Sequence, residues 1–264
     1  MTWFMGIDIG SGTSKGVIMK DGKIEAYSLL ASGINYRASA QNLRDGLLAK
    51  AGLAPEDIAF TVATGHSAGN VPFSNQYITD IRCCARGMRS VCPNVRTIID
   101  IQRQSSQVLL LNSTGQVVNF VVTEKCAAGS GYFIEVIANI LQIKLEDIGS
   151  LSLSSINPVI FTTGCAVFGE SEAVSRVAEG AAREDIVAGV HRALAEKISG
   201  MVAMVGLEEE CAISGGGGLN IGLVKSIEAK LGIRLFVPPQ PQLVTAIGAA
   251  IIAQEEAIRQ QSKV

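Results

Sequence analysis

The feature that most constrains the fold is a pattern of strand, aspartate, polar loop, strand, turn and strand that occurs twice in the chain. The first copy is WFMGIDIGSGTSKGVIMKDGKIEAYSLL, in which Asp8 ends an apolar run and Asp21-Gly22 indicates a turn. The second copy extends from Val95 to Val122, with Asp100 in the position of Asp8. Two copies of one supersecondary unit predict two similar α/β halves that face each other across a cleft.

Helical patterns occupy much of the remaining chain. Apolar spacing predicts helices at Ala38 to Ala51, Tyr77 to Val91, Glu170 to Gly180, Glu184 to Val205 and Val244 to Ala257. Short strands are expected at Ile58 to Ala63 and Cys211 to Ser214. We expect residues 1–93 together with 243–264 to form the first half, and residues 94–242 to form the second.

Composition excludes several classes of protein. The chain has 264 residues and a formal net charge of −2, which argues against nucleic acid or an anionic membrane as a partner. It has no run of about eighteen apolar residues, and its N-terminus lacks the pattern of a signal peptide. Its six cysteines lack the density and spacing of a disulfide scaffold. These features predict a cytoplasmic protein.

The loop after the first strand is a candidate phosphate site. Its backbone amides and hydroxyl groups can surround phosphate oxygens, and its residues are Gly10, Ser11, Gly12, Thr13 and Ser14. Lys15 supplies a cation for the phosphates, and Asp8 is placed to hold a hydrated Mg²⁺. The spacing differs from that of a Walker A loop. Because tight hairpins use the same residue types, the loop is compatible with a purely structural role as well.

A second glycine-rich loop follows the strand that ends at Ser214. Its residues are Gly215, Gly216, Gly217 and Gly218, and a helical pattern begins after them. Glycines between a strand and a helix allow a flat group such as a nucleobase or a ribose to approach the backbone closely. The alternative is a flexible link, although the patterned flanks favour a binding loop.

Two cysteines, Cys126 and Cys165, stand among small residues just before helical patterns. The positive end of a helix dipole lowers the pKa of a nearby thiol and favours the thiolate, which is a nucleophile, a redox centre or a metal ligand. Two cysteines cannot fill a four-thiolate site, but two chains on a twofold axis can. The other cysteines, interpreted as small buried hydrophobic residues, are Cys83, Cys84, Cys92 and Cys211.

These motifs together resemble one family. The chain is similar to the ATPase activators of 2-hydroxyacyl-CoA dehydratases and to the ATP-binding subunits of benzoyl-CoA reductase, which are BadF/BadG/BcrA/BcrD-type ATPases. The segments that carry the resemblance are GIDIGSGTSK, Thr64-Gly65, KCAAGSG, GCAVFGESE, SGGGG and PPQPQLVTAIGAA. The resemblance implies an actin-like ATPase of the superfamily of sugar kinases, heat-shock proteins and actin. Its two RNase H-like halves would enclose a nucleotide cleft.

The resemblance also implies cofactors, partners and site residues. It implies a dimer, of this chain with itself or with a homologous ATPase subunit, that shares one [4Fe-4S] cluster held by Cys126 and Cys165 of each subunit. ATP or ADP with Mg²⁺ would set the angle between the cluster-bearing helices. An electron from a ferredoxin or flavodoxin-type donor would then pass at low potential to acyl-CoA reductase or dehydratase subunits. Catalytic roles are carried over to Asp8, Asp100 and Gln104.

The second phosphate loop departs from the family pattern. The family reads close to DIGGQDSK, whereas this chain reads DIQRQSSQ from Asp100 to Gln107. Gln102 and Arg103 replace two glycines and should obstruct close approach of the backbone to the terminal phosphates, although Arg103 offers an alternative phosphate charge. The lost carboxylate removes a group that could position Mg²⁺ or water. A weakened site suits an asymmetric pair with an intact partner, which favours the divergent D-type subunit of benzoyl-CoA reductase.

Other functions stay open. One is the homodimeric activator of a 2-hydroxyacyl-CoA dehydratase. Another is a nucleotide-sensing or assembly subunit that binds ATP but hydrolyses it weakly or not at all. A small-molecule kinase is disfavoured, because such enzymes need a catalytic carboxylate opposite the γ-phosphate and the altered loop lacks one. The leading hypothesis is an ATP-hydrolysing iron–sulfur subunit of an oxidoreductase complex.

Overall fold

The computed structural model describes residues 2–123, 131–161 and 166–262. The chain forms two compact units, one made of Met1–Pro93 with Gln242–Val264 and the other of Asn94–Pro241. Each unit contains one five-stranded mixed sheet. Among the helices of these described ranges, none combines the length and the apolar character needed to cross a membrane.

The first unit is built on the sheet β3-β2-β1-β4-β5. The three N-terminal strands pair antiparallel with one another, whereas β4 and β5 run parallel to the strands beside them. The strands are β1 (Trp3–Ile9), β2 (Thr13–Lys20), β3 (Lys23–Ala31), β4 (Ile58–Thr64) and β5 (Gln76–Tyr77), and the helices are α1 (Tyr36–Ala51), α2 (Asp80–Val91) and α8 (Val244–Gln261).

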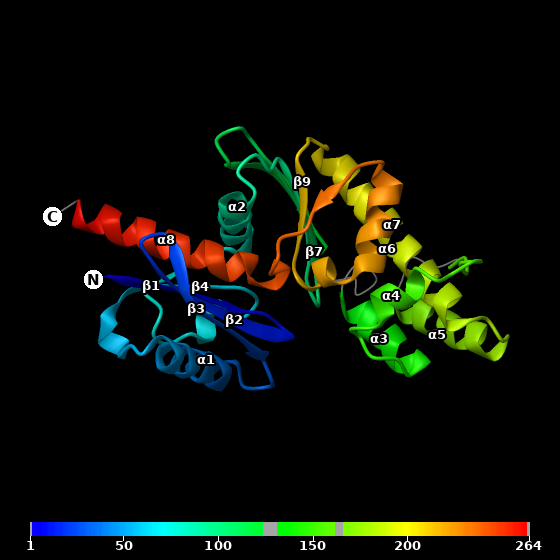
Figure 1. Cartoon of the computed structure of the whole chain (residues 1–264), viewed down its shortest axis with the longest axis horizontal. Helices are drawn as coiled ribbons and strands as arrows, with labels where there is room; N and C mark the ends of the chain where they lie inside the picture. The colour runs from blue at the N-terminus through cyan, green and yellow to red at the C-terminus, as the bar shows by residue number, and fades with distance from the viewer. Residues whose placement is uncertain (1, 124–130, 162–165, 263–264) are drawn as a thin grey trace. The chain divides into compact units, whose positions relative to one another are not determined.

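Two helices cover the two faces of this sheet (Figure 1). On one face, α1 buries Leu43 and Leu47 against a cluster of strand residues. On the other face lies the alanine-rich α8, and Gly6 of β1 allows it to come close, because a Cβ atom at Gly6 would collide with the backbone of Ala246 and Ala250. Small residues on both sides of this contact therefore set how closely the last helix packs on the first strand.

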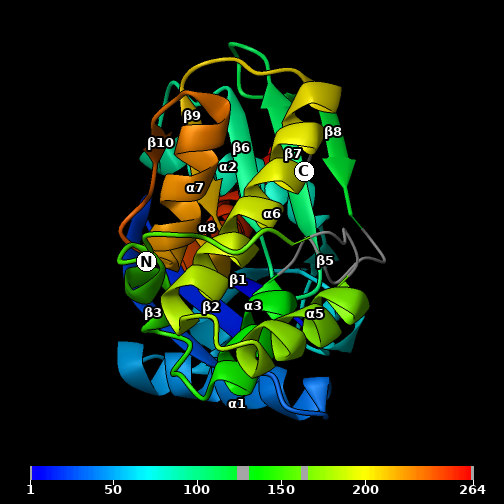
Figure 2. The ribbon, with the colours of Figure 1, turned by 90° about the vertical axis from the view of Figure 1, so that its right-hand side faces the viewer.

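The second unit is built on the sheet β10-β9-β6-β7-β8. Its long helix α6 and the shorter α7 lie side by side over one face of the sheet (Figure 2). The strands are β6 (Thr97–Ile101), β7 (Ser106–Leu111), β8 (Val117–Val122), β9 (Cys211–Ser214) and β10 (Leu235–Phe236), and the helices are α3 (Gly131–Leu141), α4 (Ile148–Ser152), α5 (Ala166–Ala178), α6 (Arg183–Val205) and α7 (Ile221–Leu231).

The two sheets repeat one plan, strand for strand. β6 to β10 occupy the positions in the second sheet that β1 to β5 occupy in the first. The register agrees as well, because Asp8 lies opposite Lys15 on one side and Thr64 on the other. Asp100 likewise lies opposite Gln107 and Ser214. The predicted repeat of strand, aspartate, loop and strand is confirmed.

One predicted helix begins later than its sequence pattern indicated. We expected a helix from Tyr77 to Val91, but α2 begins at Asp80. Gln76 and Tyr77 form β5 and pair with Val62 and Ala63 of β4. A two-residue strand has too few residues to show an alternating pattern, so the sequence could not distinguish it from the first turn of the helix.

Candidate functional site

The first hairpin brings Asp8 and Lys15 together. Asp8 stands near the end of β1, and Lys15 lies directly opposite it on β2. The Nζ atom of Lys15 lies 3.1 Å from the Oδ2 atom of Asp8, and both side chains are largely buried. The turn between them is closed by the Gly10 amide, which donates to the Thr13 carbonyl at 3.1 Å. A cation and a carboxylate are thus held at the base of a glycine-containing turn.

Ser32, directly after β3, fixes this turn from outside. Its hydroxyl donates to the Gly10 carbonyl at 2.6 Å, and its amide donates to the Gly12 carbonyl at 3.1 Å. Within the described ranges, the amides of Ser11 and Gly12 have no backbone acceptor. Turn amides that are not used by the protein can donate to a phosphate. Sequence reasoning missed Ser32, because it follows the loop by about twenty residues and carries no motif of its own.

Gly65 closes the other side of Asp8. Its φ of +88° lies in the left-handed region, and a Cβ atom there would collide with Oδ1 of Asp8 and crowd the Ile9 carbonyl. The chain after β4 can therefore pass directly over the carboxylate only because residue 65 is glycine. The Ser67 amide donates to the Ile9 carbonyl at 3.0 Å and holds this passage in place.

The second hairpin has the same frame with different chemistry. The Gln102 amide donates to the Ser105 carbonyl at 2.9 Å and closes the turn. The carboxylate of Asp100 is buried and accepts three hydrogen bonds, two from the side-chain amide groups of Gln102 (2.7 Å) and Gln107 (2.8 Å) and one from the Ser214 hydroxyl (2.8 Å). All three donors are neutral. Asp100 is therefore held by dipoles, whereas Asp8 is held by a cation.

Two residues of the second loop, Gln104 and Arg103, are not among the hydrogen-bond donors to Asp100. Gln104 is exposed at the tip of the loop and takes no part in the hydrogen bonds described for Asp100. The Nε atom of Arg103 lies 3.0 and 2.9 Å from the two carboxylate oxygens of Glu135 on α3. Its guanidinium also lies 5.1 Å from the ring centroid of Tyr132. The charge that we expected Arg103 to offer to phosphate is thus paired with Glu135 in this structure.

The glycine-rich loop after β9 packs against its own unit. Gly215 has a φ of +76°, and a Cβ atom there would collide with the Ile101 carbonyl and approach Asp100, as Gly65 does with Asp8. A Cβ atom at Gly217 would lie 2.5 Å from the side chain of Ile101. These glycines therefore have a packing role within the unit, in addition to the ligand-binding role predicted from the sequence. Gly216 begins the short 3₁₀ turn Gly216–Leu219, and Gly218 packs against Pro241.

A buried histidine supports the start of the helix after this loop. The Nε2 atom of His191 on α6 accepts from the side-chain amide of Asn220 at 2.9 Å, which leaves Nδ1–H to donate to the Ser152 hydroxyl at 3.0 Å. Asn220 also caps α7, because its side chain accepts from the Leu223 amide. Burial lowers the pKa of His191 to about 4. The neutral ring thus joins α4, α6 and the first turn of α7.

The two predicted cluster ligands, Cys126 and Cys165, lie outside the described residues. The helices that follow them are described, and these helices, α3 and α5, pack side by side (Figures 1 and 2). Gly169 in the first turn of α5 lies against Phe133 in the first turn of α3, where a Cβ atom would come within 2.7 Å of the Phe133 ring. The starts of the two helices therefore meet.

The four remaining cysteines are buried, which confirms their interpretation as small hydrophobic residues. Burial raises the pKa of the Cys83 thiol to about 12. Burial raises the pKa of Cys211 as well. Thiols with raised pKa values are poor metal ligands, because the thiolate is the form that binds metal. The described cysteines therefore offer no competing metal site.

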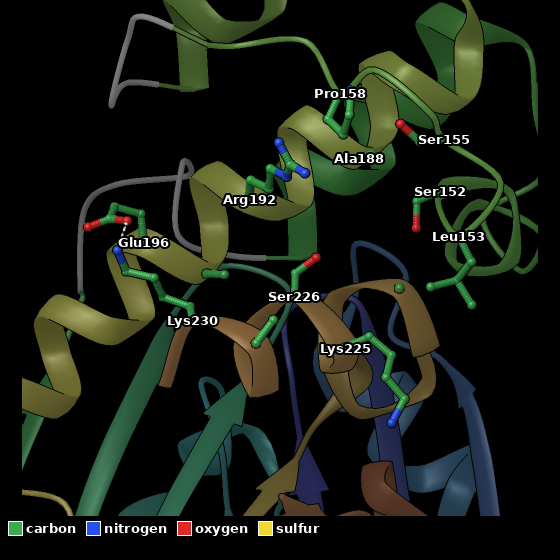
Figure 3. Close-up of a pocket in the computed structure, with 13 residues that line it drawn as sticks. Ser152, Leu153, Ser155, Pro158, Ala188, Arg192, Glu196, Lys225, Ser226 and Lys230 are labelled. Carbon is green, nitrogen blue, oxygen red and sulfur yellow. Dashed lines mark ion pairs between the residues drawn. The ribbon is translucent and has the colours of Figure 1, made fainter. Parts of the chain in front are cut away.

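A groove of about 530 Å³ lies elsewhere in the second unit, between α4, α6 and α7 (Figure 3). Its two lysines are engaged in ion pairs, since Lys230 binds Glu196 at 2.5 Å and Lys225 binds Glu228 at 2.7 Å. The described residues that line it include none of the predicted site residues. They are Ser152, Leu153, Ser155, Pro158, Ala188, Arg192, Ala195, Glu196, Gly222, Lys225, Ser226, Ala229 and Lys230.

Comparison with known proteins places this geometry in context. The chain is 40% identical over 261 residues to the 2-hydroxyisocaproyl-CoA dehydratase activator of Clostridioides difficile, covering 98% of each chain. It is 30% identical over 262 residues to the D-type subunit of benzoyl-CoA reductase of Thauera aromatica, covering 95% of this chain and 93% of that one. The solved structure of the Clostridium difficile activator with bound ADPNP superimposes with a TM-score of 0.94 at 38% identity, covering 99% of this chain and 98% of that one.

More distant structures bear on the fold alone. The actin-like protein MreB 5 of Spiroplasma citri, bound to AMPPNP, matches with a TM-score of 0.59 at 11% identity, covering 100% of this chain and 99% of that one. The expected actin-like α/β fold is confirmed by this match and by the two equivalent sheets. Residues 5–253 match the BadF/BadG/BcrA/BcrD ATPase family. The chain therefore belongs to the BadF/BadG/BcrA/BcrD ATPase family.

Proposed function

We propose that this chain is an ATP-dependent electron donor that passes a low-potential electron, through a [4Fe-4S] cluster shared by two subunits, to an enzyme that acts on an acyl-CoA. The cluster would supply one-electron chemistry when bound. Cys126 and Cys165 are the proposed ligands from each chain, and the donor would be a ferredoxin or a flavodoxin-type protein. The dimer would form from two copies of this chain or from this chain and a homologous ATPase subunit.

The observation that carries the proposal is the contact between the first turns of α3 and α5. Each of these helices follows one of the two cysteine segments along the chain, and Gly169 packs on Phe133 where the helices begin. Two helices that start side by side can bring the thiolates before them to one site, and the positive ends of the two helix dipoles favour the negative charge of a cluster. Cys126 and Cys165 are also the cysteines that remain as ligands, because the other four are buried within the two units.

Nucleotide binding is supported by the first hairpin. We propose that the turn from Gly10 to Ser14 and Lys15 bind phosphates, that Asp8 orients hydrated Mg²⁺, and that the loop Gly215 to Gly218 lies against the adenosine. The amides of Ser11 and Gly12, which have no backbone acceptor among the described residues, support the first assignment. The exposed side chain of Leu219, directly after the glycine loop, offers apolar surface for a nucleobase. Asp100 and Gln104 are proposed to assist hydrolysis from the second hairpin.

Between the two kinds of complex, higher identity favours the dehydratase activator. The chain is 40% identical to the 2-hydroxyisocaproyl-CoA dehydratase activator and 30% identical to the D-type subunit of benzoyl-CoA reductase. We therefore rank the activator function above the reductase function, which reverses the preference drawn from the altered second loop. An altered loop alone is weak support for a different partner, because its side chains are accommodated by the hairpin and by α3.

Anaerobic purification with quantitation of iron and sulfide tests the proposal. We expect about four irons for every two chains, and loss of both iron and visible absorbance in Cys126→Ser and Cys165→Ser variants. The matched controls are Cys84→Ala and Cys92→Ala, which remove buried cysteines and should retain the iron. A colourless wild-type protein after anaerobic reconstitution with iron and sulfide would overturn the proposal.

A second function, a nucleotide-sensing subunit that hydrolyses ATP weakly, is favoured by one observation. The carboxylate of Asp100 accepts from three neutral donors of its own unit, so most of its roughly four acceptor sites are already used and little capacity is left for Mg²⁺ or its water ligands. Measurement of phosphate release, alone and with the partner enzyme, distinguishes the two functions. Turnover with the partner supports the electron donor, whereas a cluster without turnover in either condition supports the sensing subunit.

A further inference from the structure

We propose that Arg103 is a positioning residue that fastens the start of α3 to the second hairpin, so that a change of nucleotide state at this hairpin is transmitted to α3 and α5. The inference rests on the proposed function, because it assigns a mechanical role to the hairpin of that nucleotide site. It concerns described residues of the second unit alone.

Two backbone hydrogen bonds make the first part of this connection. The Gly131 amide donates to the Gln102 carbonyl at 2.8 Å, and the Tyr132 amide donates to the Arg103 carbonyl at 2.8 Å. These are the first two amides of α3, which have no acceptor inside the helix. The second loop therefore caps α3. Gly131 permits the approach, because a Cβ atom there would lie 3.2 Å from the Gln102 carbonyl.

The side chain of Arg103 makes the second part of the connection between the loop and α3. It is bound to both carboxylate oxygens of Glu135, one turn into α3, and its guanidinium stacks over the ring of Tyr132. Both side chains of the ion pair are about one third exposed, so the contact is partly shielded from water. Its two groups can still separate without the cost of leaving a charge buried. An arginine can make these contacts at once because its planar group pairs with a carboxylate and stacks on an aromatic ring.

Further contacts continue from this point in two directions. Toward the hairpin, Gln102 binds Asp100 through its side chain and α3 through its carbonyl, so the carboxylate and the helix share one residue. Toward the helices, Phe133 follows Tyr132 and packs on Gly169 of α5. A contiguous series of packed and hydrogen-bonded groups is the kind of physical path that can carry coupling. The first hairpin differs, because its turn is held by Ser32 after the adjacent strand and not by a helix.

Hydrogen exchange of α3 tests the proposal. Nucleotide affinity is measured first, and amide exchange in Gly131–Leu141 is then compared between ADP and a non-hydrolysable ATP analogue. We expect the wild-type exchange rates to differ by about twofold or more between the two nucleotides. The Arg103→Ala and Glu135→Gln variants should bind nucleotide and retain iron but lose this difference. A double variant, Arg103→Glu with Glu135→Arg, should recover it in part, which loss of folding alone would not produce.

The matched control is Arg86→Ala, which removes an arginine–glutamate ion pair in the first unit, between Arg86 of α2 and Glu255 of α8. It should leave the response of α3 unchanged. A wild-type protein that binds nucleotide without any response in α3 overturns the inference, and so does an Arg103→Ala variant that responds as the wild type does. Wild-type protein that binds no nucleotide overturns the proposed function instead, so the two failures are distinguishable.

Discussion

The two hairpins share a backbone frame but differ in how each stabilises its aspartate. Asp8 lies opposite Lys15, and the two form a largely buried ion pair. Asp100 lies opposite Gln107 at the equivalent register and is held by amide and hydroxyl donors that carry no charge. A lysine can bind phosphates as a point charge, whereas a glutamine carries no charge. We infer that the same backbone frame serves two roles: the first hairpin binds phosphate, and the second hairpin supports a helix.

The shared frame depends on two glycines. Gly65 and Gly215 follow equivalent strands, both have positive φ, and both pass over the carboxylate of the neighbouring strand. The chemical difference lies in the residues at positions 15 and 107 and in the loop residues that bind Ser32 or α3. Substitutions can therefore test the frame and the chemistry separately.

The largest expected effect is that of Gly65→Ala and Gly215→Ala. Each variant adds a Cβ atom against a carbonyl and a carboxylate at a positive φ, so we expect each to lower the free energy of unfolding by about 3 kcal/mol or more. Gly22→Ala is the control, because Gly22 also has a positive φ, +75°, but has no atom within 4 Å of the added group. It should cost about 1–2 kcal/mol. Chemical denaturation measures all three, and equal losses would refute the role of the collisions.

The next effect is a difference between the two units in how their stability depends on pH. The pKa of His191 is lowered to about 4 by burial, from an ordinary value of 6.5. The neutral ring therefore contributes stability above pH 6.5 that is lost as the pH falls toward 4, and the loss reaches about 3 kcal/mol at most. We expect the second unit to lose structure first on acidification, as followed by hydrogen exchange in α6 and α7. A His191→Gln variant should show a flatter dependence on pH, and an unchanged dependence would contradict this cause.

Replacement of the Lys15 side chain by a neutral one tests the chemical difference between the two hairpins directly. Lys15→Gln gives the first hairpin the residue type of the second, and we expect the Kd for ATP to rise by about 10- to 100-fold, as loss of a charged hydrogen bond implies. Calorimetric titration measures the change, with Lys23→Gln as a control on an exposed lysine. A Kd within about twofold of the wild-type value would mean that Lys15 does not contact phosphate.

The smallest effects compare the helix caps of the two units. Asn35 caps α1 by accepting from the Ala38 amide at 3.0 Å on an exposed surface. Asn220 caps α7 in the same way and also donates to the buried His191. We expect Asn35→Ala to cost about 1 kcal/mol and Asn220→Ala to cost more, since it leaves a buried nitrogen without its donor. Thermal unfolding of both variants measures the difference, and equal shifts would contradict the role of His191.

Much of the frame could be predicted from the sequence, because it is encoded locally. The polar glycine loop after Asp8 predicts the first hairpin, the turn at Asp21-Gly22 predicts the strand that follows it, and the repeat predicts the second hairpin. The contacts that distinguish the hairpins are not local. Arg103 precedes its partner Glu135 by about thirty residues, and nothing in the spacing joins them. Ser32 and His191 were missed for the same reason, since their roles arise only when strands and helices pack together.

The roles assigned to the cysteines and loop residues come from resemblance to a family, and they stay predictions. The described structure brings Asp8 together with Lys15, and Asp100 with Gln107 and Ser214. It leaves Gln104 apart from them at the loop tip. The glycine loop shows that a motif can have two uses, because glycines expected to receive a ligand also pack against Ile101 and Pro241.

In the proposed function, ATP drives an electron out of this protein. The most direct test reduces the anaerobic protein, mixes it with a low-potential viologen acceptor, and follows the visible absorbance with ATP, with ADP or without nucleotide. We predict that one electron leaves for every two chains, with a rate that rises on addition of ATP and not of ADP. Oxidation that is equally fast in all three conditions, or the absence of any visible absorbance to follow, would contradict this function.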